Sequence, residues 1–136
     1  MTMLLADVRV GLKTRLETIS GLRVSSKHPA MANVPAAMIR RVGSPSRDTF
    51  SGRAHHNFEI LVLVQAVDID RAQAVLDLYT DLSGTKSIRA ALEADNTLGG
   101  AAEYIAVGDW DLDADVDYND VQYLGAKLPV EVAVTY

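Results

Sequence analysis

The chain has 136 residues, of which 49% are hydrophobic and 23% are charged. This composition excludes a disordered chain and fits one globular domain over residues 1–136. It contains no cysteine, which excludes disulfides and thiolate metal sites. No apolar run approaches the roughly 20 residues of a membrane-spanning helix, so we expect no association with a membrane.

The net charge of −5 is unevenly distributed. Residues 1–53 carry nine lysines and arginines against three acids, a net of +6. Residues 54–136 carry four lysines and arginines against fifteen acids, a net charge of −11. Such an asymmetry is compatible with a nucleic-acid surface on the basic part. It is equally compatible with contacts between opposite ends of identical subunits, or with a solvated surface on which charges cluster by chance.

The first predicted element is a helix, because apolar residues recur at spacings of three and four: Leu5, Val8, Leu12, Leu16 and Ile19. Gly21 is placed to end it. Residues 22–24 and 36–42 are predicted strands.

Residues 43–57 are polar, aperiodic and contain glycine, which predicts a long flexible loop. Loops of about fifteen residues in compact domains are commonly functional or mobile. We therefore take its basic and imidazole side chains as candidate interface residues: Arg47, Arg53, His55 and His56.

The second half alternates strands and helices. Residues 58–67 are apolar on both faces, which predicts a central strand covered on both sides. A helix follows from Asp68 or Asp70, with a stripe of Ala72, Val75, Tyr79 and Leu82, and a shorter one is capped by Ser87. Strands are expected at 102–110 and 121–136, with Pro129 marking an edge or a bulge. The order predicts an α+β fold, with two to three helices packed on a mostly antiparallel sheet.

The most unusual segment places an aspartate at every second position: Asp109, Asp111, Asp113, Asp115 and Asp117. The residues between them are apolar, so an extended chain would carry one row of carboxylates and one apolar row. The spacing can also be laid on a calcium loop that ends at Asp120. Position six of that loop is then Ala114 instead of glycine, and position twelve lacks glutamate. A solvated strand face or a hairpin tip is the favoured interpretation.

No catalytic pattern emerges, and we expect no enzyme, no cofactor and no metal site. His55, His56 and Glu59 lack the second histidine of an inverted zincin motif. No serine lies in a G-x-S-x-G context, and Gly99-Gly100 has no phosphate-loop lysine beside it.

A resemblance comes from the segment Ser87–Gly100, which follows the pattern S-I-x-x-A-L-x-x-D-x-T-L-G-G after an amphipathic helix. Together with Pro29, Pro35-Ala36 and Tyr123-Leu124-Gly125-Ala126, it resembles the tail terminator or head-to-tail connector proteins of long-tailed actinobacterial phages. The likeness covers most of the chain, although the aspartate row departs from the family pattern.

The resemblance implies a homo-oligomeric ring, usually a hexamer, that caps the tail tube in the virion and is made in the host cytoplasm. Its implied partners are the major tail tube protein, the neck or head-completion proteins, and DNA that passes without specific binding. A tail-completion or neck protein is the alternative role, and a calcium-binding module over Asp109–Asp120 is a further one. If the protein forms such a ring, we expect the aspartates to face its channel, because like charge keeps DNA phosphates away. We expect Arg47 and Arg53 to contact a neighbouring ring or tube subunit.

Overall fold

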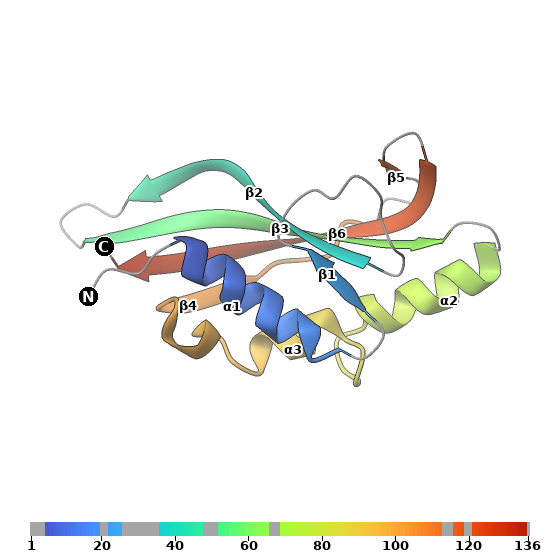
Figure 1. The fold of residues 1–136 in the computed structure, drawn as a ribbon, viewed down its shortest axis with the longest axis horizontal. Coiled ribbons are helices and arrows are strands. Elements are labelled where there is room, and N and C mark those ends of the chain that lie inside the picture. Colours follow the sequence, from blue (N-terminus) through green and yellow to red (C-terminus); the bar gives the residue numbers. More distant parts are fainter. Residues whose placement is uncertain are drawn as a thin grey trace.

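The computed structural model describes residues 5–19, 22–25, 36–47, 52–65, 69–112, 116–118 and 121–135. It is an α+β structure in which three α-helices lie on one face of a curled sheet (Figure 1). The elements, in chain order, are α1 (Leu5–Glu17), β1 (Arg23–Ser25), β2 (Ala36–Arg47), β3 (Arg53–Gln65), α2 (Ile69–Thr80), α3 (Ile88–Glu93), the short 3-10 helix η1 (Leu98–Gly100), β4 (Tyr104–Val107), β5 (Val116–Tyr118) and β6 (Val121–Thr135).

The sheet has the strand order β1–β2–β3–β6–β4, and β5 pairs with β6 beside this path. Among the described strands, only β1 and β2 run parallel. The β2–β3, β3–β6, β4–β6 and β5–β6 pairs are antiparallel. The longest ladder joins β3 to β6 from Arg53 opposite Thr135 to Gln65 opposite Tyr123. The predicted α+β fold with a mostly antiparallel sheet is therefore confirmed.

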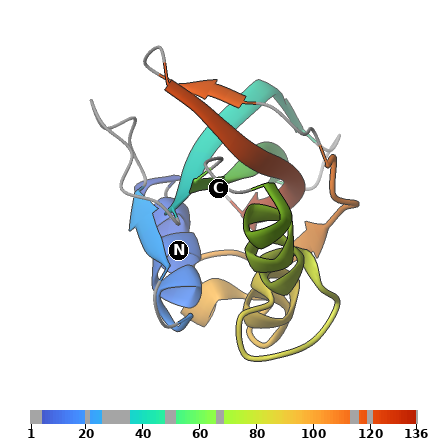
Figure 2. The same ribbon diagram turned by 90° about the vertical axis from the view of Figure 1, so that its right-hand side faces the viewer.

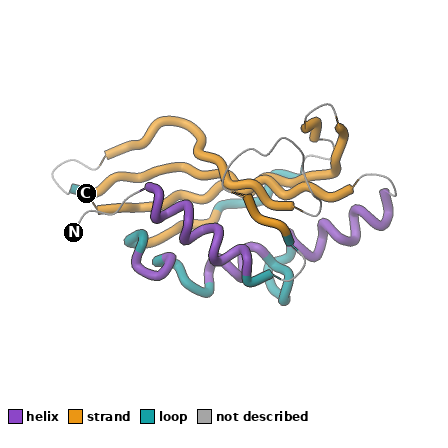
Figure 3. Tube along the Cα trace, viewed as in Figure 1, coloured by secondary structure: helices purple, strands orange, loops and turns teal. Residues whose placement is uncertain are grey.

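The main core lies between the helices and the sheet, as Figures 2 and 3 show with the helices gathered on one side of the strands. Val8, Leu12 and Leu16 of α1 are fully buried, which confirms the predicted stripe. Phe58 and Ile60 of β3 face them from the sheet and are equally buried. Successive strand residues point to opposite faces, so this face takes every second residue of β3.

A second, smaller core lies on the opposite face of the sheet, which we call the outer face. It consists of Met38, Leu61, Leu63 and Tyr123, all buried. At Leu61–Val64, β3 is therefore buried on both faces, which confirms the predicted central strand.

The predicted loop at 43–57 is wrong. Strand β2 continues to Arg47 and β3 begins at Arg53, so most of this stretch is a β-hairpin. The alternation is hidden in β2 by an irregularity between Val42 and Ser46, where Gly43 has a φ of +68°. A bulge of this kind shifts the register and removes the period-two signal.

The β3 half of the hairpin is polar because only one of its faces is covered. Ala54 and Phe58 are buried under the helix layer, whereas Asn57, on the outer face between them, is exposed. A strand that is covered on one face carries polar side chains at alternate positions, and these polar residues led to the predicted loop.

The helix α2 ends at Thr80, before the predicted Leu82, whose side chain is 73% exposed. Leu76 is buried in its place. The cap of α3 is as predicted, since the Ser87 hydroxyl accepts a hydrogen bond of 3.1 Å from the Ala90 backbone N–H.

Pro129 lies at neither the edge nor a bulge of the sheet, contrary to the prediction. It occupies the interior of β6, opposite Glu59. Its carbonyl oxygen accepts a 2.8 Å hydrogen bond from the N–H of Gly108, just after β4 ends. In an antiparallel sheet the backbone nitrogen and oxygen of one residue point toward the same neighbouring strand. The nitrogen of Pro129, which has no hydrogen to donate, therefore faces the chain just beyond the end of β4, where the regular strand pairing has stopped.

Candidate functional site: a hollow on the outer face

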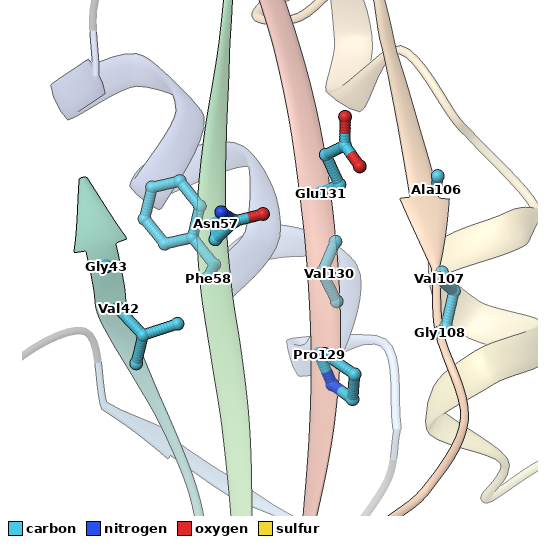
Figure 4. Close-up of a pocket in the computed structure, with 10 residues that line it drawn as sticks. All are labelled: Val42, Gly43, Asn57, Phe58, Ala106, Val107, Gly108, Pro129, Val130 and Glu131. Atoms are coloured by element: carbon cyan, nitrogen blue, oxygen red, sulfur yellow. The ribbon is translucent and has the colours of Figure 1, made fainter. Parts of the chain in front are cut away.

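The outer face carries an open hollow of about 430 Å³ between β2, β3, β6 and β4. Figure 4 shows it with the strands in front and the helix layer behind. Its walls are mostly apolar or small, and the lining residues are Val42, Gly43, Asn57, Phe58, Ala106, Val107, Gly108, Pro129, Val130 and Glu131. We refer to this feature as the hollow.

The hollow exists because none of the three described α-helices covers this part of the outer face (Figures 1 and 4). Asn57, Ala106, Pro129 and Glu131 are exposed along it. Gly108 also keeps the space open, since a Cβ there would lie 2.8 Å from the Pro129 ring. The hollow is thus a solvent-facing sheet surface with apolar walls.

Two contacts between polar side chains flank the hollow along the strands. The Arg40 guanidinium donates two hydrogen bonds to the Glu59 carboxylate, one of 2.8 Å from Nε, across β2 and β3. The Nδ1 atom of His55 lies 2.9 Å from Oε1 of Glu131, across β3 and β6. Each pair joins residues on facing strands, so the pairs fix the polar side chains beside the hollow.

The predicted interface residue Arg53 has a partner within its own chain. Its Nε atom lies 2.7 Å from Oε2 of Glu103. The Thr135 hydroxyl donates a hydrogen bond to the other carboxylate oxygen. These hydrogen bonds, led by that from Thr135 and aided by the charge of Arg53, lower the pKa of Glu103. Arg53 is therefore held in place at the start of β3.

The two histidines lie on opposite faces of β3 and form no common site. His55 faces Glu131 on the outer face, and His56 lies on the helix side, opposite Val132. Burial, followed by the charges of Arg41 and His55, lowers the pKa of His56. The backbone of Arg47 pairs with Ala54 at the hairpin end, and its side chain lies outside the described residues. Among the described side chains, those of His55 and His56 are therefore not brought together in one cluster.

Part of the aspartate row lies within the described residues. Asp109 and Asp111 are exposed, and the backbone of Asp111 bonds to that of Lys127 at 2.8 and 2.9 Å. Asp113 and Asp115 lie outside the described residues, and so does the side chain of Asp117. The channel-facing role therefore stays a prediction.

The apolar row beside the aspartates follows the predicted pattern only in part. Trp110 packs against the main core, but the side chain of Leu112 is 64% exposed. The elements on either side are the strands β4 and β6, whereas a calcium loop of the EF-hand type needs helices there. Asp120 is outside the described residues, and within the described part of the chain no three His, Asp or Glu side chains are grouped to hold a metal ion.

The segment that carries the resemblance forms a compact turn. The Asp95 carboxylate accepts hydrogen bonds from the Thr97 hydroxyl at 3.0 Å and from the Gly99 N–H at 2.9 Å. The bond from Thr97 is the main reason that the pKa of Asp95 is lowered. The turn also places Leu98, with a φ of +52°, against Gly11 of α1. These motif residues thus build the connection between α3 and β4.

The hollow was not found from the sequence. Val42, Ala106 and Pro129 are far apart along the chain and meet through the β2–β3, β3–β6 and β4–β6 registers. An exposed proline inside an otherwise regular strand was the one available signal.

Comparison with protein-family models gives no match for this chain, and comparison with curated proteins gives none either. No helix among the described residues is long and apolar enough to cross a membrane.

Proposed function

We propose that this protein is a structural component of a phage virion, a tail terminator whose ring caps the tail tube and joins it to the neck of the head. The observation that carries the proposal is the unequal cover of the sheet: helices lie on one face, and the hollow opens on the other. A domain that leaves an apolar sheet surface open has a surface available for another protein layer. The pattern of Ser87–Gly100 supports the choice of family.

The hairpin residues Arg47 and Arg53 contact a neighbouring ring or tube subunit, and His55 and His56 belong to the same proposed interface. Glu103 holds Arg53 at the start of β3, and a fixed side chain loses less conformational freedom on binding. The row from Asp109 to Asp117 faces the channel and repels the passing DNA phosphates.

Removal of the encoding gene from the phage tests the proposal. A tail terminator stops addition of tube protein, so its loss gives overlong tails that are not joined to heads under the electron microscope. Tails of normal length that remain unjoined would instead indicate the tail-completion or neck role. Normal virions would contradict both.

Charge reversal tests the hairpin contact. The double variant Arg47→Glu and Arg53→Glu should yield rings that fail to bind assembled tubes in a co-sedimentation assay. Lys13→Glu, at a side chain of α1 that is 43% exposed, is the matched control and should bind as the natural protein does. Undiminished binding by the double variant would show that the hairpin makes no such contact.

A further inference from the structure

Three basic side chains from different elements lie around Phe58 on the helix side of the sheet, where the first half of α1 packs below β2 and β3 (Figure 1). The Arg9 guanidinium of α1 lies 5.8 Å from the centre of the Phe58 ring. Arg41 of β2 pairs directly with Phe58 of β3. His56 lies two residues before Phe58, on the same face of β3. We call Arg9, Arg41 and His56 the basic cluster.

The strand geometry brings the members of the basic cluster within reach of one small ligand. Side chains that pair across antiparallel strands have their Cβ atoms about 5 Å apart. Residues two apart on one strand are separated by about 7 Å. Burial and, after it, the charge of Arg41 lower the pKa of His56, which places these two side chains in the same electrostatic environment. His56 is therefore a neutral imidazole beside a guanidinium at neutral pH.

The acids on the surrounding elements have other neighbours. Strand β2 contains no acid. The acids of α1, β3 and β6 are placed as follows: Asp7 lines a cleft with Gly99, Glu17 lies 3.7 Å from Lys13, Glu59 is bonded to Arg40, and Glu131 lies beside His55. Arg41 is exposed, and within the described part of the chain it forms no ion pair with any of these acids.

The imidazole of His56 also has a hydrogen-bonding atom to satisfy. Its Nδ1 atom is shielded from solvent and has no hydrogen-bond partner among the described residues. A buried polar atom without a partner costs roughly 1–3 kcal/mol in general. A ligand that carries negative charge and accepts hydrogen bonds would satisfy this nitrogen and the Arg41 guanidinium together.

We propose that the basic cluster binds a phosphate group. A guanidinium donates two parallel N–H bonds to phosphate oxygens, and the exposed Arg41 is placed to do so. The Phe58 ring holds the second guanidinium, that of Arg9, through a cation–π contact. Donors from three elements suit a tetrahedral anion with several oxygens better than a planar carboxylate with two.

The phosphate group belongs either to a free phosphate ion or to a nucleic-acid backbone, since both present the same oxygens. Contacts to backbone phosphates carry no sequence information, so the second source agrees with DNA that passes without specific binding. The inference goes beyond the tail-terminator role and does not depend on it, because it concerns a site within one subunit.

An NMR titration of the full chain with inorganic phosphate, at constant ionic strength, tests the site. Bound phosphate places negative charge beside the imidazole, so the pKa of His56 should rise. The His56→Gln variant identifies the signal. A pKa of His56 that phosphate leaves unchanged, together with no effect of duplex DNA, would overturn the inference.

Variants of Arg41 test which side chain binds. Arg41→Ala should weaken phosphate binding by about tenfold or more, and Arg41→Lys, which keeps the charge without the planar fork, should lie between the two. Arg23→Ala, at an exposed arginine of β1, is the matched control and should bind as the natural protein does. Because Arg41 is exposed, its variants should unfold in urea as the natural protein does. Equal phosphate binding by Arg41→Ala and the natural protein would overturn the inference.

A parallel titration with short duplex DNA separates the two sources. If the ligand is a nucleic-acid backbone, DNA should raise the pKa of His56 at lower concentration than phosphate does, and its affinity should fall steeply with added salt. If the ligand is a free phosphate ion, inorganic phosphate alone should raise it. Either result, when Arg41→Ala removes it, supports the site.

Discussion

The two faces of strand β3 differ in what covers them. Toward the helices, Phe58 and Ile60 have no exposed surface. Toward the outer face, Asn57 is exposed beside the hollow, and Nδ1 of His55 lies 2.9 Å from Oε1 of Glu131. One strand therefore supplies both the folding core and the surface that we assign to assembly. Substitutions on the covered face of β3 should therefore change folding stability, whereas substitutions at neighbouring positions on the outer face should change association.

The largest effect is expected for Phe58→Ala on the covered face. Its ring is fully buried, and the Arg9 guanidinium lies 5.8 Å from the ring centroid. Loss of such a ring costs about 3–5 kcal/mol of unfolding free energy. Asn57→Ala, one residue away but exposed, should change it by no more than about 0.5 kcal/mol. Urea unfolding measures both, and equal effects would remove the distinction between the two faces.

A smaller effect is expected for Ser87→Ala, in the helix layer. The hydroxyl accepts from the Ala90 N–H and donates to the Asp81 carbonyl, and its residue is buried. Loss of a helix cap costs about 1–2 kcal/mol. The exposed Ser83→Ala is the control and should be within about 0.5 kcal/mol of the natural protein. If the two variants lose the same stability in thermal unfolding, the Ser87 cap does not stabilise the helix layer.

Gly11→Ala tests the contact between α1 and the turn before β4. An added Cβ would lie 2.8 Å from the Cβ of Leu98. Overpacking costs about 1–3 kcal/mol, and alanine returns about 1 kcal/mol through its higher helix propensity. The net result should be a loss of about 1 kcal/mol, whereas Val10→Ala, at an exposed site, should be near neutral. A stabilised Gly11→Ala variant would show that the helix layer is looser than described.

The smallest effect concerns pH and the covered side of β3. Burial and the Arg41 charge lower the pKa of His56 below its ordinary value of 6.5. Between the lowered pKa and 6.5, the unfolded chain binds more protons than the folded one, so stability falls as pH drops through this window. His56→Gln should make the unfolding free energy less dependent on pH between pH 7.5 and 5. An unchanged pH dependence would contradict the assignment to His56.

The sequence was sufficient where local patterns decide the structure. The α1 stripe and the Ser87 cap follow from helical spacing and a hydroxyl at the right position. The doubly buried part of β3 follows from its unbroken apolar run.

The sequence was insufficient where tertiary contacts decide. The hairpin around Arg47 and Arg53 was missed because its outer face is polar and Gly43 interrupts the register. The hollow could not be derived, because it depends on the pairing of β4 and β3 with β6, across large separations in the chain. The partner of Arg53 was hidden for the same reason, since Glu103 lies fifty residues further along.

The central claim is that this protein acts through the surfaces it offers to its own copies and to adjoining layers of a virion. Sedimentation equilibrium of the purified full-length chain over a wide concentration range tests it most directly. The account predicts one closed oligomer of fixed size that dissociates to monomer on dilution, with ring-shaped particles in electron micrographs. A monomer at every concentration would contradict it.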